Sequence, residues 1–81
     1  MASRYVVVKT IGQLKTVDSI YTEYEGAVHA LTHVRDLVKR AHGMTRVAIN
    51  GDIEVLSKQG NVIATYSIET RAGFAEGEYN G

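Results

Sequence analysis

The chain has 81 residues, of which nine are basic and nine acidic, so its formal net charge at pH 7 is zero. This length suits one domain, and the neutral balance disfavours both a strongly basic nucleic-acid binder and a highly acidic mimic of DNA. Cysteine is absent, which excludes disulfides and thiolate metal sites. The apolar runs are too short for a signal peptide or a membrane span, so we expect a cytoplasmic protein.

The first third of the chain predicts a β-hairpin. Residues 4–11 contain the β-branched run Val6-Val7-Val8, and residues 14–21 contain further apolar side chains at strand spacing. Between them, Gly12-Gln13 places glycine at the first central position of a tight turn, which is the preference of type II′. Both faces of this hairpin carry apolar groups, so its register stays open.

One amphipathic helix is predicted from Thr22 to Gly43. The segment Thr22-Glu23-Tyr24-Glu25 has the form of a capping box, with threonine as the capping residue. At the other end, Gly43 can take the left-handed conformation that terminates many helices. An apolar stripe with helical spacing predicts that one face packs on a sheet; the stripe consists of Ala27, Ala30, Leu31, Val34, Leu37, Val38 and Ala41.

The remaining chain predicts three strands, at residues 45–49, 53–58 and 62–69, which turn at Asn50-Gly51 and around Gly60. If Gly60 and Asn61 are the loop residues of the second turn, Ile53 lies opposite Ile68 and Val55 opposite Tyr66. Residues 71–81 contain three glycines and no periodicity. We therefore expect one domain over residues 1–70, followed by a flexible tail.

The predicted order β-β-α-β-β-β indicates an α+β fold, with one helix packed on a mainly antiparallel five-stranded sheet. A right-handed crossover from the second strand through the helix would place the third strand beside the first. The expected strand order is therefore 2-1-3-4-5. A single helix cannot cover both faces of such a sheet, so a homodimer through the open face or through an edge is a reasonable addition.

Catalytic and metal-binding patterns are weak. His29 and His33 stand one helical turn apart, and carboxylates at Glu25 and Asp36 share the same helix surface, so a shared metal ion is conceivable. The metalloprotease pattern H-E-x-x-H is missing, and ordinary surface pairs account for these residues equally well. The chain also lacks a nucleophile elbow, a P-loop and a dinucleotide fingerprint. We therefore predict a non-enzymatic protein with no cofactor and no metal.

The best candidates for partner contacts are four cations and two tyrosines. The basic residues could contact an acidic protein surface or phosphates, although the helix macrodipole alone accounts for Lys39 and Arg40. The tyrosines could anchor an interface, stack on bases, or simply pack at the edge of the core. The tail aromatics Phe74 and Tyr79 could form a short binding segment or have no role of their own. The predicted partner-binding residues are Arg35, Lys39, Arg40, Arg46, Tyr5 and Tyr66.

The layout of these elements resembles that of small phage-encoded inhibitors, such as some anti-CRISPR proteins, in which a short antiparallel sheet carries one helix. The hairpin at Gly12-Gln13, the helix from Thr22 to Gly43 and the turns at Asn50-Gly51 and Gly60-Asn61 carry this likeness. It covers residues 4–69 and concerns layout rather than a motif, so no functional residue can be carried over. The resemblance implies a phage protein that acts in the host cytoplasm.

Elimination and this resemblance together predict a small protein-binding module, an inhibitor or adaptor that occupies the surface of a partner protein. The alternative is a nucleic-acid-binding module that uses the basic end of the helix. No membrane partner is expected.

Overall fold

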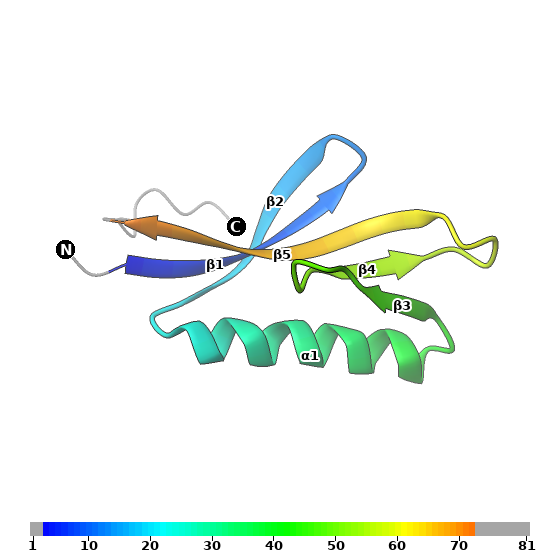
Figure 1. Cartoon of the computed structure of the whole chain (residues 1–81), viewed down its shortest axis with the longest axis horizontal. Coiled ribbons are helices and arrows are strands. Elements are labelled where there is room, and N and C mark those ends of the chain that lie inside the picture. Colours follow the sequence, from blue (N-terminus) through cyan, green and yellow to red (C-terminus); the bar gives the residue numbers. More distant parts are fainter. Residues whose placement is uncertain (1–2, 73–81) are drawn as a thin grey trace.

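The structure, a computed structural model, describes residues 3–72 (Figure 1). Five strands form one antiparallel sheet, and a single helix crosses one of its faces. The α+β prediction is therefore confirmed. The elements are β1 (Ser3–Ile11), β2 (Leu14–Tyr21), α1 (Tyr24–Arg40), β3 (Met44–Val47), β4 (Ile53–Leu56) and β5 (Val62–Ala72).

The strand order is β2-β1-β5-β4-β3, so the predicted order 2-1-3-4-5 is wrong. Both orders give every strand the same direction, which is why the crossover rule does not distinguish them. Strand length does distinguish them. β1 has nine residues and forms eight residue pairs with β5, from Ser3 opposite Ala72 to Thr10 opposite Thr65. β3 has only four residues, so at the same position it would leave much of the backbone of β1 unpaired.

β5 is shared between two neighbours along its length. Its first part, Val62–Tyr66, pairs with β4, whereas Thr65–Ala72 pairs with β1. The sheet is consequently staggered, with the β1–β2 hairpin at one end and β3 and β4 at the other (Figure 1). The strand also includes Arg71 and Ala72, the two residues that follow the predicted boundary after residue 70. The aromatic residues predicted at the tail, Phe74 and Tyr79, lie outside the described residues.

The register between β4 and β5 differs from the predicted one by two residues. Ile53 lies opposite Tyr66, because the chain reverses over Ser57–Asn61 rather than at Gly60 and Asn61 alone. The Ser57 N–H donates to the Asn61 carbonyl (2.8 Å), and Gly60 takes a φ of 87°. A shift of two residues preserves the side of the sheet to which each side chain points. Ile53 therefore still faces α1.

The core lies between α1 and the middle of the sheet. Its buried members are Val7, Ala27, Leu31 and Ile53, of which Val7 and Ala27 are fully inaccessible to water. Tyr5, Tyr21, Ala30, Tyr66 and Ile68 pack around this cluster. The predicted stripe of α1 is buried mainly in its N-terminal half, because Leu37 is 49% exposed.

The first turn of α1 lacks the predicted side-chain cap. The N-cap residue is Glu23, one position later than expected, and no side chain caps the helix there. Thr22 lies outside the helix, in the bend that follows β2, so the capping-box prediction is wrong. The nearest backbone contact is the Gly26 N–H, which donates to the Glu23 carbonyl at 3.2 Å.

A Schellman motif ends the helix, but His42 rather than Gly43 is its left-handed residue, with a φ of 61°. The Gly43 N–H donates to the Val38 carbonyl (2.8 Å), and the His42 N–H donates to the Lys39 carbonyl (3.0 Å). Glycine is needed at 43 for a different reason. A Cβ atom there would lie 2.6 Å from Val38 Cγ1, far inside van der Waals contact.

We predict that His42→Gly raises the free energy of unfolding by roughly 0.5–1 kcal/mol, because glycine adopts a positive φ without steric cost. The exposed imidazole makes no hydrogen bond or ion pair within residues 3–72 that would be lost. Urea unfolding followed by circular dichroism measures the change.

The adjacent glycine supplies the matched control. Gly43→Ala should lower the free energy of unfolding by about 1 kcal/mol or more, because the added methyl group collides with Val38. A His42→Gly variant that is less stable than the wild type would contradict the strain assigned to His42.

Candidate protein-binding surface

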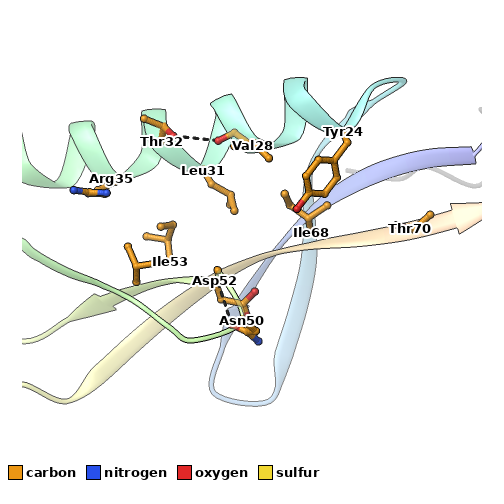
Figure 2. A pocket seen from close by; sticks show the side chains of 12 residues that line it. Tyr24, Val28, Leu31, Thr32, Arg35, Asn50, Asp52, Ile53, Ile68 and Thr70 are labelled. Carbon is orange, nitrogen blue, oxygen red and sulfur yellow. Dashed lines mark hydrogen bonds between the residues drawn. The ribbon is translucent and has the colours of Figure 1, made fainter.

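A groove runs between one flank of α1 and the sheet, with a volume of about 350 Å³. We call it the α1–β5 groove. Its floor is formed by Leu31, Ile53 and Ile68, and Figure 2 shows these side chains between the helix above and the strands below. Two residues of its wall are exposed apolar side chains of α1: Tyr24 is 56% and Val28 is 37% exposed. The groove therefore leaves apolar surface accessible next to the core.

The loop between β3 and β4 forms the opposite wall of this groove. The Asp52 N–H donates to Asn50 Oδ1 (3.1 Å), and Asn50 Nδ2 donates to Asp52 Oδ2 (3.1 Å). Gly51, with a φ of 93°, completes the turn, and its N–H donates to the Ala48 carbonyl at 2.9 Å. These contacts lie within the loop, and Arg35 lines the same groove from the helix side (Figure 2).

A second groove continues from Arg35 toward the end of the helix, and we call it the basic groove. It lies between α1 and the edge strand β3, and its lining includes Arg35, Lys39, Met44, Val47 and Leu56. Met44 is 44% and Val47 is 52% exposed. Within the described part of the chain, neither cation forms an ion pair. Two unneutralised positive charges therefore stand beside accessible apolar side chains.

The other two predicted cations are directed elsewhere. Arg46 lies opposite Glu54, and its Nε donates to Glu54 Oε1 at 2.7 Å. Its neighbour Val47 pairs with the core residue Ile53, so by strand alternation Arg46 points to the face away from α1. Arg40 is the last residue of α1 and lies outside the basic groove, about 100° around the helix from Lys39. The four cations therefore do not form one patch.

The two predicted tyrosines are separated and half-buried around the core. The Tyr5 ring meets Tyr24 edge to face, with centroids 5.6 Å apart and an angle of 77° between planes. Tyr66 packs on the core cluster, and Lys9 Nζ lies 5.6 Å from the centroid of its ring. Tyr5 lies opposite Thr70, whereas Tyr66 lies opposite Lys9, four residues farther along β1. These rings do not form a shared stacking platform for bases.

Two of the three histidines line a third groove, on the β2 side of the helix. His29 and His33 are exposed there, and Asp18 and Ser19 of β2 belong to the same lining. Within residues 3–72, no three His, Asp or Glu side chains form a group that could hold a metal ion. Ser19 Oγ is buried in this lining, and no hydrogen-bond partner for it exists among the described residues.

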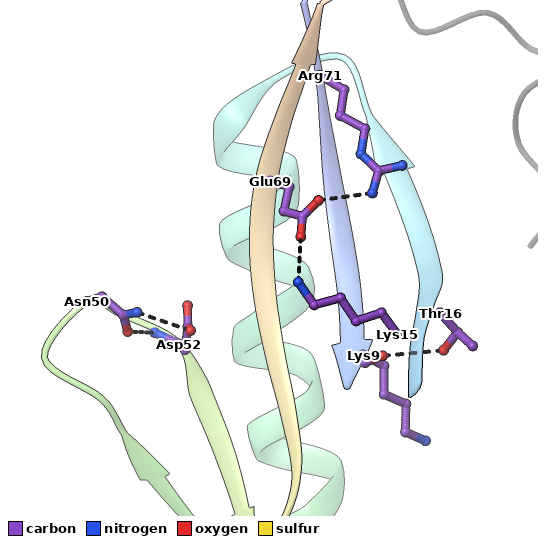
Figure 3. A network of polar contacts seen from close by, with 7 residues as sticks. All are labelled: Lys9, Lys15, Thr16, Asn50, Asp52, Glu69 and Arg71. Atoms are coloured by element: carbon purple, nitrogen blue, oxygen red, sulfur yellow. Dashed lines mark hydrogen bonds and ion pairs between the residues drawn. The ribbon is translucent and has the colours of Figure 1, made fainter. Parts of the chain in front are cut away.

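The sheet face opposite α1 is bridged by an ion pair. Lys15 Nζ of β2 lies 3.8 Å from Glu69 Oε2 of β5, and the strand between them is β1 (Figure 3). The methylene chain of Lys15 therefore passes over β1. Arg71 Nη2 in turn donates to Glu69 Oε1 at 2.9 Å. Val6 and Val8 of β1 point to this face, yet they are 0% and 1% exposed.

Comparison with known protein families, curated proteins and solved structures finds no match for this chain. The likeness to small phage-encoded inhibitors therefore stays a prediction. Within the part of the chain that the structure describes, no helix is both long enough and apolar enough to cross a membrane.

The sequence predicts Arg35 and Lys39 as binding residues but not the exposed apolar side chains of the α1–β5 groove and the basic groove. Tyr24 and Val28 occupy positions 24 and 28, one helical turn apart and off the predicted stripe. That spacing marks a second apolar strip along the helix. Met44 and Val47 became exposed because β3 is an edge strand, which follows from the strand order and not from any local pattern.

We predict that Ser19→Ala leaves the free energy of unfolding unchanged or raises it by up to about 1 kcal/mol, because it removes a buried hydroxyl that has no partner. Thermal unfolding of the purified variant measures this. Thr16→Ala is the matched control on the same strand, since Thr16 Oγ1 donates to the Lys9 carbonyl (3.4 Å), and it should be neutral or slightly destabilising. A marked loss of stability in Ser19→Ala would show that the hydroxyl has a partner.

Proposed function

We propose that this protein is a non-enzymatic protein-binding module, an inhibitor or adaptor, that holds an extended acidic segment of a partner in the basic groove. One observation carries the proposal: two cations of α1 that form no ion pair within residues 3–72, Arg35 and Lys39, line the same groove beside the edge strand β3. An edge strand offers backbone donors and acceptors to an added strand, and cations alongside it select acidic side chains.

Exposed apolar side chains support the same mode of binding. Met44 and Val47 are the first and last residues of the edge strand and line the basic groove, and the α1–β5 groove continues from Arg35 to Val28 and Tyr24. A bound strand would place alternate side chains into these grooves while its backbone pairs with β3. Apolar burial would supply affinity, and the cations would supply selectivity and speed of association.

A nucleic-acid-binding function receives less support. Tight binding to phosphates needs several cations on one surface, yet Arg46 is paired with Glu54 on the other side of the sheet. Arg35 and Lys39 alone would release few counterions. Titration of labelled duplex and single-stranded DNA and RNA at about 50 mM salt should therefore show no steeply salt-dependent binding.

The decisive experiment is affinity capture from a lysate of the native host, with captured proteins identified by mass spectrometry. We expect one stoichiometric partner for the wild type, and a loss of about tenfold or more in its recovery with Arg35→Glu or Lys39→Glu. Calorimetry with an extended acidic peptide from that partner would then test the groove directly.

Arg40→Glu is the matched control, because it makes the same charge change in the same helical turn, outside the basic groove. It should retain the partner. If all three variants lose the partner equally, long-range charge rather than the groove determines binding, and the proposed site is wrong. If the wild type enriches nothing while it binds nucleic acid, the proposed function is wrong.

A further inference from the structure

The second half of β5 has an open edge. β4 pairs with β5 only as far as Tyr66, and among the described residues β1 alone pairs with β5 from Ser67 to Ala72. The loop that precedes Ile53, residues 48–52, makes a turn that lines the α1–β5 groove, and it does not extend β4 along β5. An edge of this length is a ready template for another strand.

The side chains along this edge alternate in character. Ile68 and Thr70 point toward α1, where they line the α1–β5 groove beside the exposed ring of Tyr24 (Figure 2). Glu69 and Arg71 point to the opposite face, where they form an ion pair at 2.9 Å (Figure 3). One side of the edge therefore carries Ile68 and Thr70, and the other carries one negative and one positive charge two residues apart, with Lys15 of β2 also 3.8 Å from Glu69.

We infer that this edge pairs with the same edge of a second copy of the chain, in antiparallel orientation about a two-fold axis at Thr70. In that register, Glu69 lies opposite Arg71 of the second copy, and Arg71 lies opposite its Glu69. Opposite charges directly across an antiparallel pair are stabilising, and the symmetry provides the pair twice. The existing contact between Glu69 and Arg71 within each chain is compatible with this arrangement, because the four charges alternate in sign.

The charge pattern selects this register. A shift that moves the axis to residue 69 places Glu69 opposite Glu69, and a shift to residue 71 places Arg71 opposite Arg71. Both shifts bring like charges together. A shift by a single position would instead set the face that carries Ile68 and Thr70 against the charged face of the other copy. The register centred on Thr70 also keeps both helices on one side of a continuous sheet, where each Tyr24 borders the junction.

Many edge strands carry charges that prevent pairing with other copies, and a charge of one sign would do so here. The sequence Glu69-Thr70-Arg71 is different, because read in the antiparallel direction it complements itself. The basic groove lies beside β3, which is an edge strand, and β4 lies between β3 and β5 in the sheet. The dimer edge and the basic groove therefore lie on different strands, although both border the α1–β5 groove.

Sedimentation equilibrium of the full-length chain over a concentration series tests the inference. The wild type should shift from the mass of one chain to the mass of two as the concentration rises. Glu69→Arg and Arg71→Glu should each weaken this association about tenfold or more, because each places like charges opposite each other twice. The double variant Glu69→Arg/Arg71→Glu should regain it, since its charges are again self-complementary.

Mixing the two single variants provides a sharper readout. A chain with arginine at both positions complements a chain with glutamate at both, so an equimolar mixture should form a heterodimer although neither variant associates alone. Thermal unfolding of each variant confirms that it is folded. A wild type that remains monomeric at every concentration would overturn the inference, and so would single variants that associate as tightly as the wild type.

Discussion

The structure depends on the way in which β5 divides its backbone hydrogen bonds between two neighbours. Its first residues complete the β3–β4 end of the sheet, and its last residues complete the β1–β2 hairpin. Neither pair of strands would be stable alone in water at this length. Because Thr65 and Tyr66 are the described residues of β5 that pair on both sides, the middle of β5 carries the strand pairing between the two halves of the sheet, and α1 packs across both halves.

The same stagger creates the surfaces to which we assign binding. Where β4 ends, the helix faces β5 across the α1–β5 groove rather than across a packed strand, so Tyr24 and Val28 stay exposed. At the other end, β3 is short and outermost, so its backbone edge and the cations of α1 are accessible together. Open edges are usually an aggregation hazard, and their placement beside charged side chains is what permits selective use.

The sequence was sufficient to predict the local elements but not their arrangement. Gly12-Gln13, the apolar stripe of α1 and the turns at Gly51 and Gly60 specify hairpins and a helix through local backbone chemistry, and all these elements are present. The strand order depends instead on which strand is long enough to pair with the backbone of β1 along its whole length. That choice is made between segments far apart in the chain, so no local sequence pattern predicts it. Helix ends were predicted less well, because Thr22 and Glu23 both have polar side chains and neither caps the helix.

The candidate binding surface could likewise be predicted where it depends on local spacing, but not where it depends on how the strands are arranged. Arg35 and Lys39 stand one turn apart, so their common side of α1 follows from helical spacing alone. Arg46 was grouped with them because it is close in sequence, but strand alternation directs it to the other face of the sheet. Gly43 belongs to the motif that ends the helix, but for a reason other than the predicted one: His42 is the left-handed residue, and Gly43 is needed because it approaches Val38 closely within the same motif.

The pairing of Ser3 with Ala72 has one more consequence, which concerns the path of the chain through larger assemblies. The polypeptide enters and leaves this fold on adjacent strands, at the same end of the molecule (Figure 1). The whole unit can therefore be spliced into a surface loop of another protein at a small cost in loop-closure entropy. The same closeness makes the fold suitable for cyclisation or circular permutation, with new ends opened at the Gly12 turn.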